Sequence, residues 1–136
     1  MATFLTRRVG FSATHHYRVA AWTSERNDAV FGALGRPHAH AYTCDVTVTG
    51  VPDPSTGFVV DLAALDDALR TEVVERFDQR DINRDIPEFA DGVRLPSGEH
   101  LAQFIGERLQ GALGENARVV RVVVAENASI SATYEP

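Results

Sequence analysis

The chain has 136 residues, of which 44% are hydrophobic and 24% charged, a balance typical of one globular domain of this length. All 13 basic residues are arginines, so the absence of lysine excludes a Schiff-base lysine and a lysine general base. The formal net charge of −6 disfavours nonspecific binding to nucleic acid or to an anionic membrane. A small-molecule substrate is therefore the expected partner.

The single cysteine, Cys44, cannot form an internal disulfide, and residues 1–11 lack the apolar run of a signal peptide. No stretch reaches the roughly 18 apolar residues that are needed to span a bilayer. We therefore expect a cytoplasmic protein that does not enter membranes. Residues 1–136 show no internal repeat and no linker, which predicts a single domain.

In chain order, the mixed pattern of residues 2–14 predicts a first strand that brings His15 to an exposed rim. Residues 17–37 show no sustained periodicity and are interpreted as a long loop. Strict alternation from His38 to Thr49 then predicts a strand with His38, His40 and Cys44 on one face. Among the valines of that face, Cys44 is expected to pack in the core.

The second half of the chain predicts two helices. A turn at 53–57 is expected to reverse the chain into an antiparallel strand at 58–60. Asp61 can cap a helix with an apolar stripe at helical spacing, and Ser97 can cap another that ends at Gly111 and Gly114. The stripes consist of Leu62, Leu65, Leu69 and Val73 in the first helix and of Leu101, Ile105 and Leu109 in the second.

The polar segment 77–92 between the helices is interpreted as a loop, and residues 119–126 and 130–134 as two final strands. This order of elements indicates an α+β fold, in which helices cover one face of an antiparallel sheet.

Three histidines are candidate metal ligands. His38 and His40 are two residues apart on a strand, so they point to the same side about 7 Å apart. His15 supplies the third ligand if the first strand pairs with the second. Zinc favours imidazole nitrogen, and three protein ligands with an open fourth position are the catalytic arrangement. An H-x-H pair taken alone is equally compatible with a structural or chance arrangement.

The surrounding motifs resemble those of the 6-pyruvoyltetrahydropterin and 6-carboxytetrahydropterin synthase family. FSATH at 11–15 resembles the family's FSAxH, and PHAHAY at 37–42 resembles HGHNY. FDQRDINRDIP at 77–87 is similar to LDHxxLNDxxP, and PSGEHLA at 96–102 to PTxENLA. The resemblance implies a tunnelling fold, or T-fold, with a four-stranded antiparallel sheet and two helices on one face. It also implies that the subunits assemble into a barrel, with a homohexamer expected.

By the same resemblance, His15, His38 and His40 hold a Zn²⁺ ion and Glu126 grips the pterin ring. Glu126 ends an apolar strand, where its carboxylate could accept two hydrogen bonds from an amidine-like edge. The alternative is a solvated glutamate at a strand end. Ser97 and Glu99 are further candidate substrate-binding residues, although helix capping and the helix dipole also explain them.

The sequence departs from the family where protons are transferred. The family uses a cysteine shortly before the H-x-H pair and an Asp-His pair in the LDH motif. Leu34 stands in the cysteine position and Gln79 in the histidine position, and neither titrates near neutral pH. Asp78 is retained and is the leading candidate for an acid or base. The ordinary synthase reaction is therefore expected to be slow or absent.

Three functions remain open at this point. The first is a zinc enzyme that acts on a pterin by lyase or aldolase chemistry. The second is a relative repurposed for zinc-assisted addition, cyclisation or dehydration of a non-pterin substrate. The third is a noncatalytic binding module, which would bind without turnover.

Overall fold

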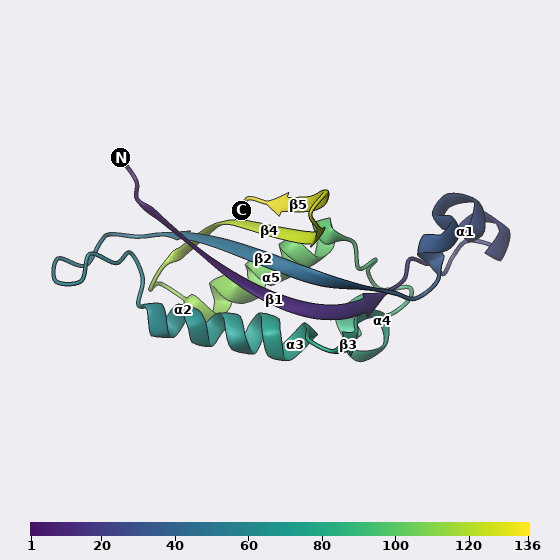
Figure 1. Cartoon of the computed structure of the whole chain (residues 1–136), viewed down its shortest axis with the longest axis horizontal. Coiled ribbons are helices and arrows are strands. Elements are labelled where there is room, and N and C mark those ends of the chain that lie inside the picture. The colour runs from purple at the N-terminus through teal and green to yellow at the C-terminus, as the bar shows by residue number, and fades with distance from the viewer.

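The computed structural model describes residues 1–136 and contains a five-stranded sheet with the strand order β3-β1-β2-β4-β5 (Figure 1). The long strands β1 and β2 pair antiparallel along their whole length, so that His15 lies opposite His38. β4 continues the antiparallel pairing beyond β2, and β5 forms a hairpin with β4. The strands are β1 (Phe4–His15), β2 (His38–Thr49), β3 (Arg80–Asp81), β4 (Arg118–Asn127) and β5 (Ile130–Tyr134).

The prediction of an antiparallel strand at 58–60 is wrong, because these residues pair with no strand. Val59 and Val60 are 5% and 4% exposed, so their hydrophobicity reflects burial in the core and not strand pairing. A strand that we did not predict, β3, pairs parallel with β1 at Ala13 and Thr14. The sheet therefore has five strands instead of the expected four, and the α+β class is confirmed.

Two long helical segments lie on one side of the sheet (Figure 1). The first runs without a break through α2 (Leu62–Leu69), a π-helical turn (Arg70–Val74) and α3 (Glu75–Phe77). Asp61 caps it as predicted, since its Oδ1 accepts a hydrogen bond from the Ala63 N–H at 2.9 Å. The second is α5 (Gly98–Leu113), which continues through Gly111 and ends at Gly114, where φ is 57°.

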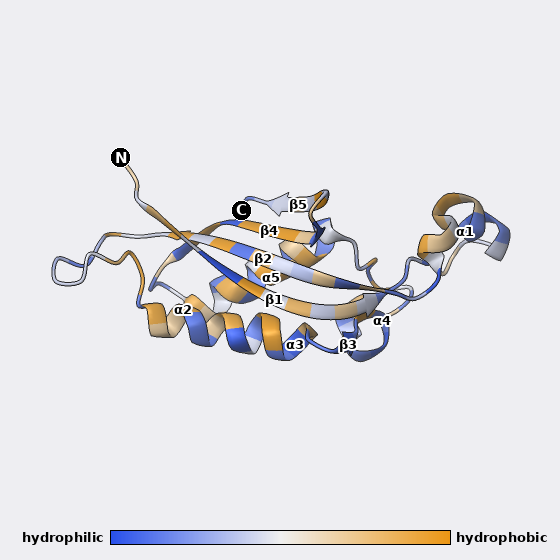
Figure 2. Ribbon diagram, viewed as in Figure 1, coloured by the Kyte–Doolittle hydropathy of each residue, from blue (hydrophilic) through white to orange (hydrophobic).

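The helices and the inner face of the sheet form one apolar core of 26 residues, which include Tyr42, Val46, Leu65 and Ile105. Hydrophobic and polar residues alternate along the strands and around the helices, as Figure 2 shows by colour. Cys44 is fully buried, which confirms the prediction that it packs in the core, and burial raises the pKa of its thiol to about 12. The opposite face of the sheet is polar and carries the Arg8–Asp45 ion pair.

The segment 17–37 is not the plain loop that we predicted. It contains α1 (Ser24–Phe31) followed by a 3-10 turn (Gly32–Gly35), and it stands apart from the sheet in Figure 1. Thr23 caps α1 by accepting a hydrogen bond from the Arg26 N–H. The buried Asn27 side chain binds both the N–H and the carbonyl of Val19. These polar hydrogen bonds hold α1 in place, and the helix lacks the apolar stripe by which a helix is recognised in a sequence.

The expected loop at 77–92 also contains short regular elements: β3, α4 (Ile82–Asp85) and a 3-10 turn (Pro87–Phe89). Ile82 and Phe89 are fully buried and attach this segment to the core. No helix of the structure is both long and apolar enough to cross a membrane.

Candidate metal centre and ligand cavity

The pairing of β1 with β2 brings the three predicted metal ligands together. His15 ends β1 directly opposite His38, and His40 lies opposite Ala13. The ring of His15 is 4.5 Å from that of His38 and 5.1 Å from that of His40, measured between centroids. One ligand nitrogen from each histidine lies within 4.8 Å of the other two. Two strands far apart in the sequence therefore present three imidazoles to one point.

Main-chain carbonyls fix the tautomers of two of these rings. The Nδ1 atom of His15 lies 2.8 Å from the Pro96 carbonyl oxygen, and that of His38 lies 2.8 Å from the Arg36 carbonyl oxygen. A carbonyl can only accept, so each Nδ1 must carry a proton and donate it. The lone pair of the neutral ring is consequently on Nε2. This arrangement, with Nδ1 anchored and Nε2 free, is typical of metal-binding histidines.

The unpaired ring nitrogens fit a metal ion. His15 is fully buried, and burial lowers its pKa to about 4, so the ring is neutral at pH 7. The Nε2 atoms of His15 and His40 are buried and have no hydrogen-bond partner in the chain. Three nitrogens bound to one tetrahedral zinc would lie about 3.4 Å apart, and the nitrogens of the three histidines lie within 4.8 Å of one another. The donor set therefore fits zinc.

Glu126 faces the histidines from the neighbouring strand β4. Its carboxylate oxygens lie 3.7 Å from the Nε2 of His40 and 4.0 Å from the Nε2 of His15. Tyr17 donates its hydroxyl hydrogen to Glu126 Oε1 at 3.4 Å. Burial, and after it the charge of Glu126, raise the pKa of Tyr17, which therefore stays protonated. Tyr17 thus helps to orient the carboxylate.

Tyr17, His38, His40 and Glu126 line a cavity of about 440 Å³, a size suited to a small ligand. His40 and Glu126 form its inner part, with side chains 19% and 15% exposed. Leu34 and Ile130 are 51% and 53% exposed and lie at its mouth. The full lining consists of Tyr17, Leu34, His38, His40, Gly98, Glu99, Val124, Glu126, Asn127, Ile130, Ser131 and Ala132.

The structure brings some of the other predicted residues into this cavity and not others. Glu99 lines it. Ser97 does not, and its hydroxyl caps α5 by accepting a hydrogen bond from the His100 N–H at 3.2 Å. Asp78 also lies outside the cavity, and its Oδ1 accepts the Ser12 N–H at 2.8 Å. The adjacent Gln79 has a φ of 61°, a left-handed conformation that is uncommon for a residue other than glycine.

Our reading of the sequence missed the polar cluster beside His15. The Asn83 side chain accepts the His16 N–H at 2.9 Å and donates to the His16 carbonyl and to Asp91. The His16 side chain is only 17% exposed and contacts Asp91 at 2.9 Å through Nε2. These contacts hold the end of β1 against the segment that contains Pro96. The LNDxxP-like motif around Asn83 was the available signal.

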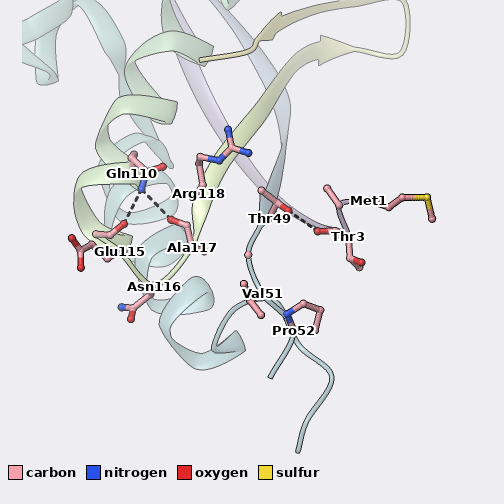
Figure 3. Close-up of a pocket in the computed structure, with 13 residues that line it drawn as sticks. Met1, Thr3, Thr49, Val51, Pro52, Gln110, Glu115, Asn116, Ala117 and Arg118 are labelled. Atoms are coloured by element: carbon pink, nitrogen blue, oxygen red, sulfur yellow. Dashed lines mark hydrogen bonds between the residues drawn. The ribbon is translucent and has the colours of Figure 1, made fainter. Parts of the chain in front are cut away.

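The largest hollow in the molecule is unrelated to the histidines. It encloses about 1040 Å³ beside the N-terminus and the end of β2 (Figure 3). Gln110 spans one wall by donating to the carbonyls of Gly114 and Ala117, and Thr49 donates to the Thr3 carbonyl. Because this hollow contains no histidine or cysteine and only one carboxylate, Glu115, it offers neither a metal site nor a catalytic pair.

A family model described as 6-pyruvoyl tetrahydropterin synthase matches residues 4–136. The chain is 35% identical over 111 residues to the human 6-pyruvoyl tetrahydrobiopterin synthase, a match that covers 80% of this chain and 75% of the human one. It is 32% identical over 126 residues to the Drosophila melanogaster protein of the same name, with 90% and 73% covered.

Comparison with solved structures points to the same family. The Caenorhabditis elegans 6-pyruvoyl tetrahydropterin synthase superposes with a TM-score of 0.91 at 25% identity, over 100% of this chain and 96% of that one. A Plasmodium vivax 6-pyruvoyltetrahydropterin synthase shares the fold, with a TM-score of 0.70 at 17% identity over 100% and 98% of the two chains. With nearly the whole chain matched in sequence and in structure, the protein belongs to the 6-pyruvoyl tetrahydropterin synthase family.

Proposed function

We propose that this chain is a zinc-dependent enzyme that acts on a pterin by lyase or aldolase chemistry. The observation that carries the proposal is a cluster of three histidine nitrogens beside a cavity that His38, His40 and Glu126 line. Family membership supports the same reading. The composition and the single cysteine are compatible with a cytoplasmic enzyme.

In this proposal His15, His38 and His40 hold the zinc, which supplies Lewis acidity to a substrate carbonyl or hydroxyl oxygen. Glu126 accepts hydrogen bonds from the amino and ring N–H groups of the pterin, a paired contact that orients the ring. Tyr17 keeps Glu126 in position through the contact at 3.4 Å. Glu99 lines the cavity and is a second acceptor for the substrate, while Ser97 acts only indirectly as the cap of α5.

The ordinary synthase reaction should be slow in this chain. Leu34 lines the cavity at the position that corresponds to the family's cysteine, and its side chain cannot accept a proton. Asp78 is a general acid or base only for a cavity that it can reach, and it is not in the cavity of its own chain. We therefore propose that Asp78 serves the cavity of a neighbouring subunit within a homohexamer.

The same Leu34 favours a second candidate function, a relative repurposed for zinc-assisted chemistry on a non-pterin substrate. A third, the noncatalytic module, would bind its ligand without turnover.

Metal analysis tests the zinc site. The purified protein should carry about one zinc per chain, and His38→Ala and His40→Ala should each lose most of it, because each removes a direct bond. His100→Ala is the matched control, since the Nδ1 of His100 donates to the Leu95 carbonyl away from the cluster. Unchanged zinc content in both cluster variants would refute the site.

Calorimetry with a pterin separates the first candidate function from the second. Glu126→Gln should weaken pterin binding by about 1.5–3 kcal/mol through the loss of a charge-assisted pair. Glu115→Gln, an exposed change outside the cavity, should leave the affinity unchanged. Equal affinity of the Glu126→Gln variant and the wild type would argue for a non-pterin substrate.

A further inference from the structure

The Pro96 carbonyl, which holds the His15 ring, lies in a segment without main-chain hydrogen bonds of its own. Residues 94–96 form neither helix nor strand, and none of the main-chain hydrogen bonds outside those elements involves them. Proline also has no N–H to donate. His100 connects this segment to α5, because its Nδ1 donates to the Leu95 carbonyl at 2.7 Å. The distance between the segment and β1 therefore depends on side chains that bridge the two.

Asn83 takes the place of a strand partner at the end of β1. β3 pairs with β1 at Ala13 and Thr14 and ends there. At His16, the residue after β1, the Asn83 side chain accepts the N–H at 2.9 Å and donates to the carbonyl at 3.0 Å. An N–H only donates and a carbonyl only accepts, so these two bonds also fix the direction in which the amide faces. The main chain directly after His15 is thereby held, although β3 has already ended.

Asp91 extends this contact to the segment that carries Pro96. Asn83 Nδ2 donates to Asp91 Oδ1 at 3.2 Å, and the same oxygen lies 2.9 Å from His16 Nε2. A hollow of about 330 Å³ is lined by Asn83, Asp91 and Pro96 among other residues. If the Asn83 amide is removed, water can enter from this hollow and bind the polar groups that lose their partner. Water would not, however, keep the segment at a fixed distance from β1.

We propose that Asn83 is a positioning residue of the metal site, which acts on His15 through the main chain of His16 and through the segment that carries Pro96. This inference rests on the proposed zinc site and adds a residue that does not itself touch the metal. His15 is the last residue of β1, where β2 holds the main chain on one side through the pairing with His38. Asn83 holds it from the other side. Removal of a group that orients a metal ligand typically lowers metal affinity about 10–100-fold.

Zinc affinity, measured by competition with a chromogenic chelator, tests the inference without any substrate. Asn83→Ala should weaken zinc binding about 10–100-fold. Asn27→Ala is the matched control, because Asn27 is 6% exposed against 7% for Asn83 and its amide likewise binds both main-chain groups of one residue, Val19. The Asn27 side chain contacts none of the three histidines, so the control should keep its zinc affinity within about twofold of the wild type.

The Co²⁺-loaded protein gives a second readout, since the visible spectrum of this ion depends on its coordination geometry. Asn83→Ala should change the spectrum, and Asn27→Ala should reproduce that of the wild type. Asp91→Ala provides a further variant that breaks the same link. The Asp91 side chain is 44% exposed, so this variant should fold even if Asn83→Ala does not. It should also weaken zinc binding, by about 10-fold.

The outcomes separate this inference from the zinc site itself. Wild-type zinc affinity and an unchanged cobalt spectrum in Asn83→Ala would overturn the inference and leave the zinc site intact, and so would wild-type affinity in Asp91→Ala. An equal loss of affinity in Asn83→Ala and Asn27→Ala would also overturn it, because the loss would then reflect general destabilisation. A wild-type protein that binds no zinc would overturn the proposed zinc site, and this inference with it.

Discussion

At the scale of single residues, the candidate site combines groups of very different exposure. His15 is completely buried and tied to the main chain, whereas Leu34 at the cavity mouth is half exposed. Asp78 differs from both, because its carboxylate binds the Ser12 N–H at the opposite end of the contact between β1 and β3. The sequence predicted the histidines by their motif, but it could not reveal that Asp78 lies outside the cavity that His38 and His40 line.

Asp78 and His38 should complement each other if neighbouring chains share a site. We expect Asp78→Asn to lower kcat more than it raises KM, and His38→Ala to abolish turnover. Each variant alone would then have little or no activity, but mixed oligomers would contain sites with an intact Asp78 from one chain and an intact His38 from another. The measurement is the rate regained after the two variants are unfolded and refolded together. No recovery over the separately refolded proteins would refute the shared site.

Cys44 should be almost unreactive in the folded protein. Burial raises the pKa of its thiol to about 12, so the reactive thiolate is scarce at pH 8, and the side chain is fully buried. We expect labelling by a disulfide reagent to be at least about 10³-fold slower than in the unfolded chain. The chain has one cysteine, so the released chromophore reports on this residue alone. Rapid labelling of one thiol per folded chain would contradict the structure.

At the scale of elements, predictions succeeded where an apolar pattern and a packing surface coincide. Both strands β1 and β2 and both capped helices were foreseeable, since each has one face that is buried against the sheet. Helix α1 was not foreseeable by the same rule, because its one buried residue is Asn27. Thr23 at its start and Gly32 at its end are the boundary signals that could have indicated it.

The false strand at 58–60 and the missed strand β3 share a cause, because pairing depends on tertiary neighbours. Val59 and Val60 enter the core as irregular chain after the turn at 53–57. β3 is only two residues long and polar, and it forms because the segment after α3 returns beside the end of β1. Neither outcome can be read from local periodicity.

A pair of glycine substitutions tests this packing. At Gly50 an added Cβ would lie 2.6 Å from the Val59 carbonyl oxygen, a main-chain atom that cannot turn aside. Gly50→Ala should therefore destabilise the protein by about 1–3 kcal/mol. Gly111→Ala should stabilise it by about 0.5–1 kcal/mol, because Gly111 lies within α5 with open space around it.

Denaturant unfolding of both variants gives the comparison. Equal shifts of the same sign at the two positions would show that segment 58–60 does not pack against Gly50 as the structure has it.

At the scale of the whole molecule, the sheet has two open edges. β3 pairs with β1 only at Ala13 and Thr14, and Asp78 and Gln79 bind Ser12, so residues 4–11 have no strand partner on that side. The outer edge of β5 is also free. Exposed strand edges favour pairing with another chain, and closure of the sheet into a barrel removes them. The polar outer face, with its Arg8–Asp45 pair, would then line the interior of the barrel.

We therefore expect the protein in solution to have about six times the 14.9 kDa mass of one chain. Sedimentation equilibrium over a range of concentrations measures this mass directly. A species of 14.9 kDa at micromolar concentration would contradict the expected homohexamer, and so would any particle whose chains are too few to close the barrel.

The carbonyl oxygens of Pro96 and Arg36 that hold the two imidazoles belong to the backbone, and every amino acid possesses one. No side-chain replacement at position 96 or 36 can remove such an acceptor, so alanine scanning will not detect the contribution of these two carbonyls. The residue types at these two positions can therefore change without loss of the two hydrogen bonds, as long as the backbone path stays the same. A designer who transplants the three histidines into another protein must therefore reproduce the backbone path of these two segments, whereas their residue types can differ.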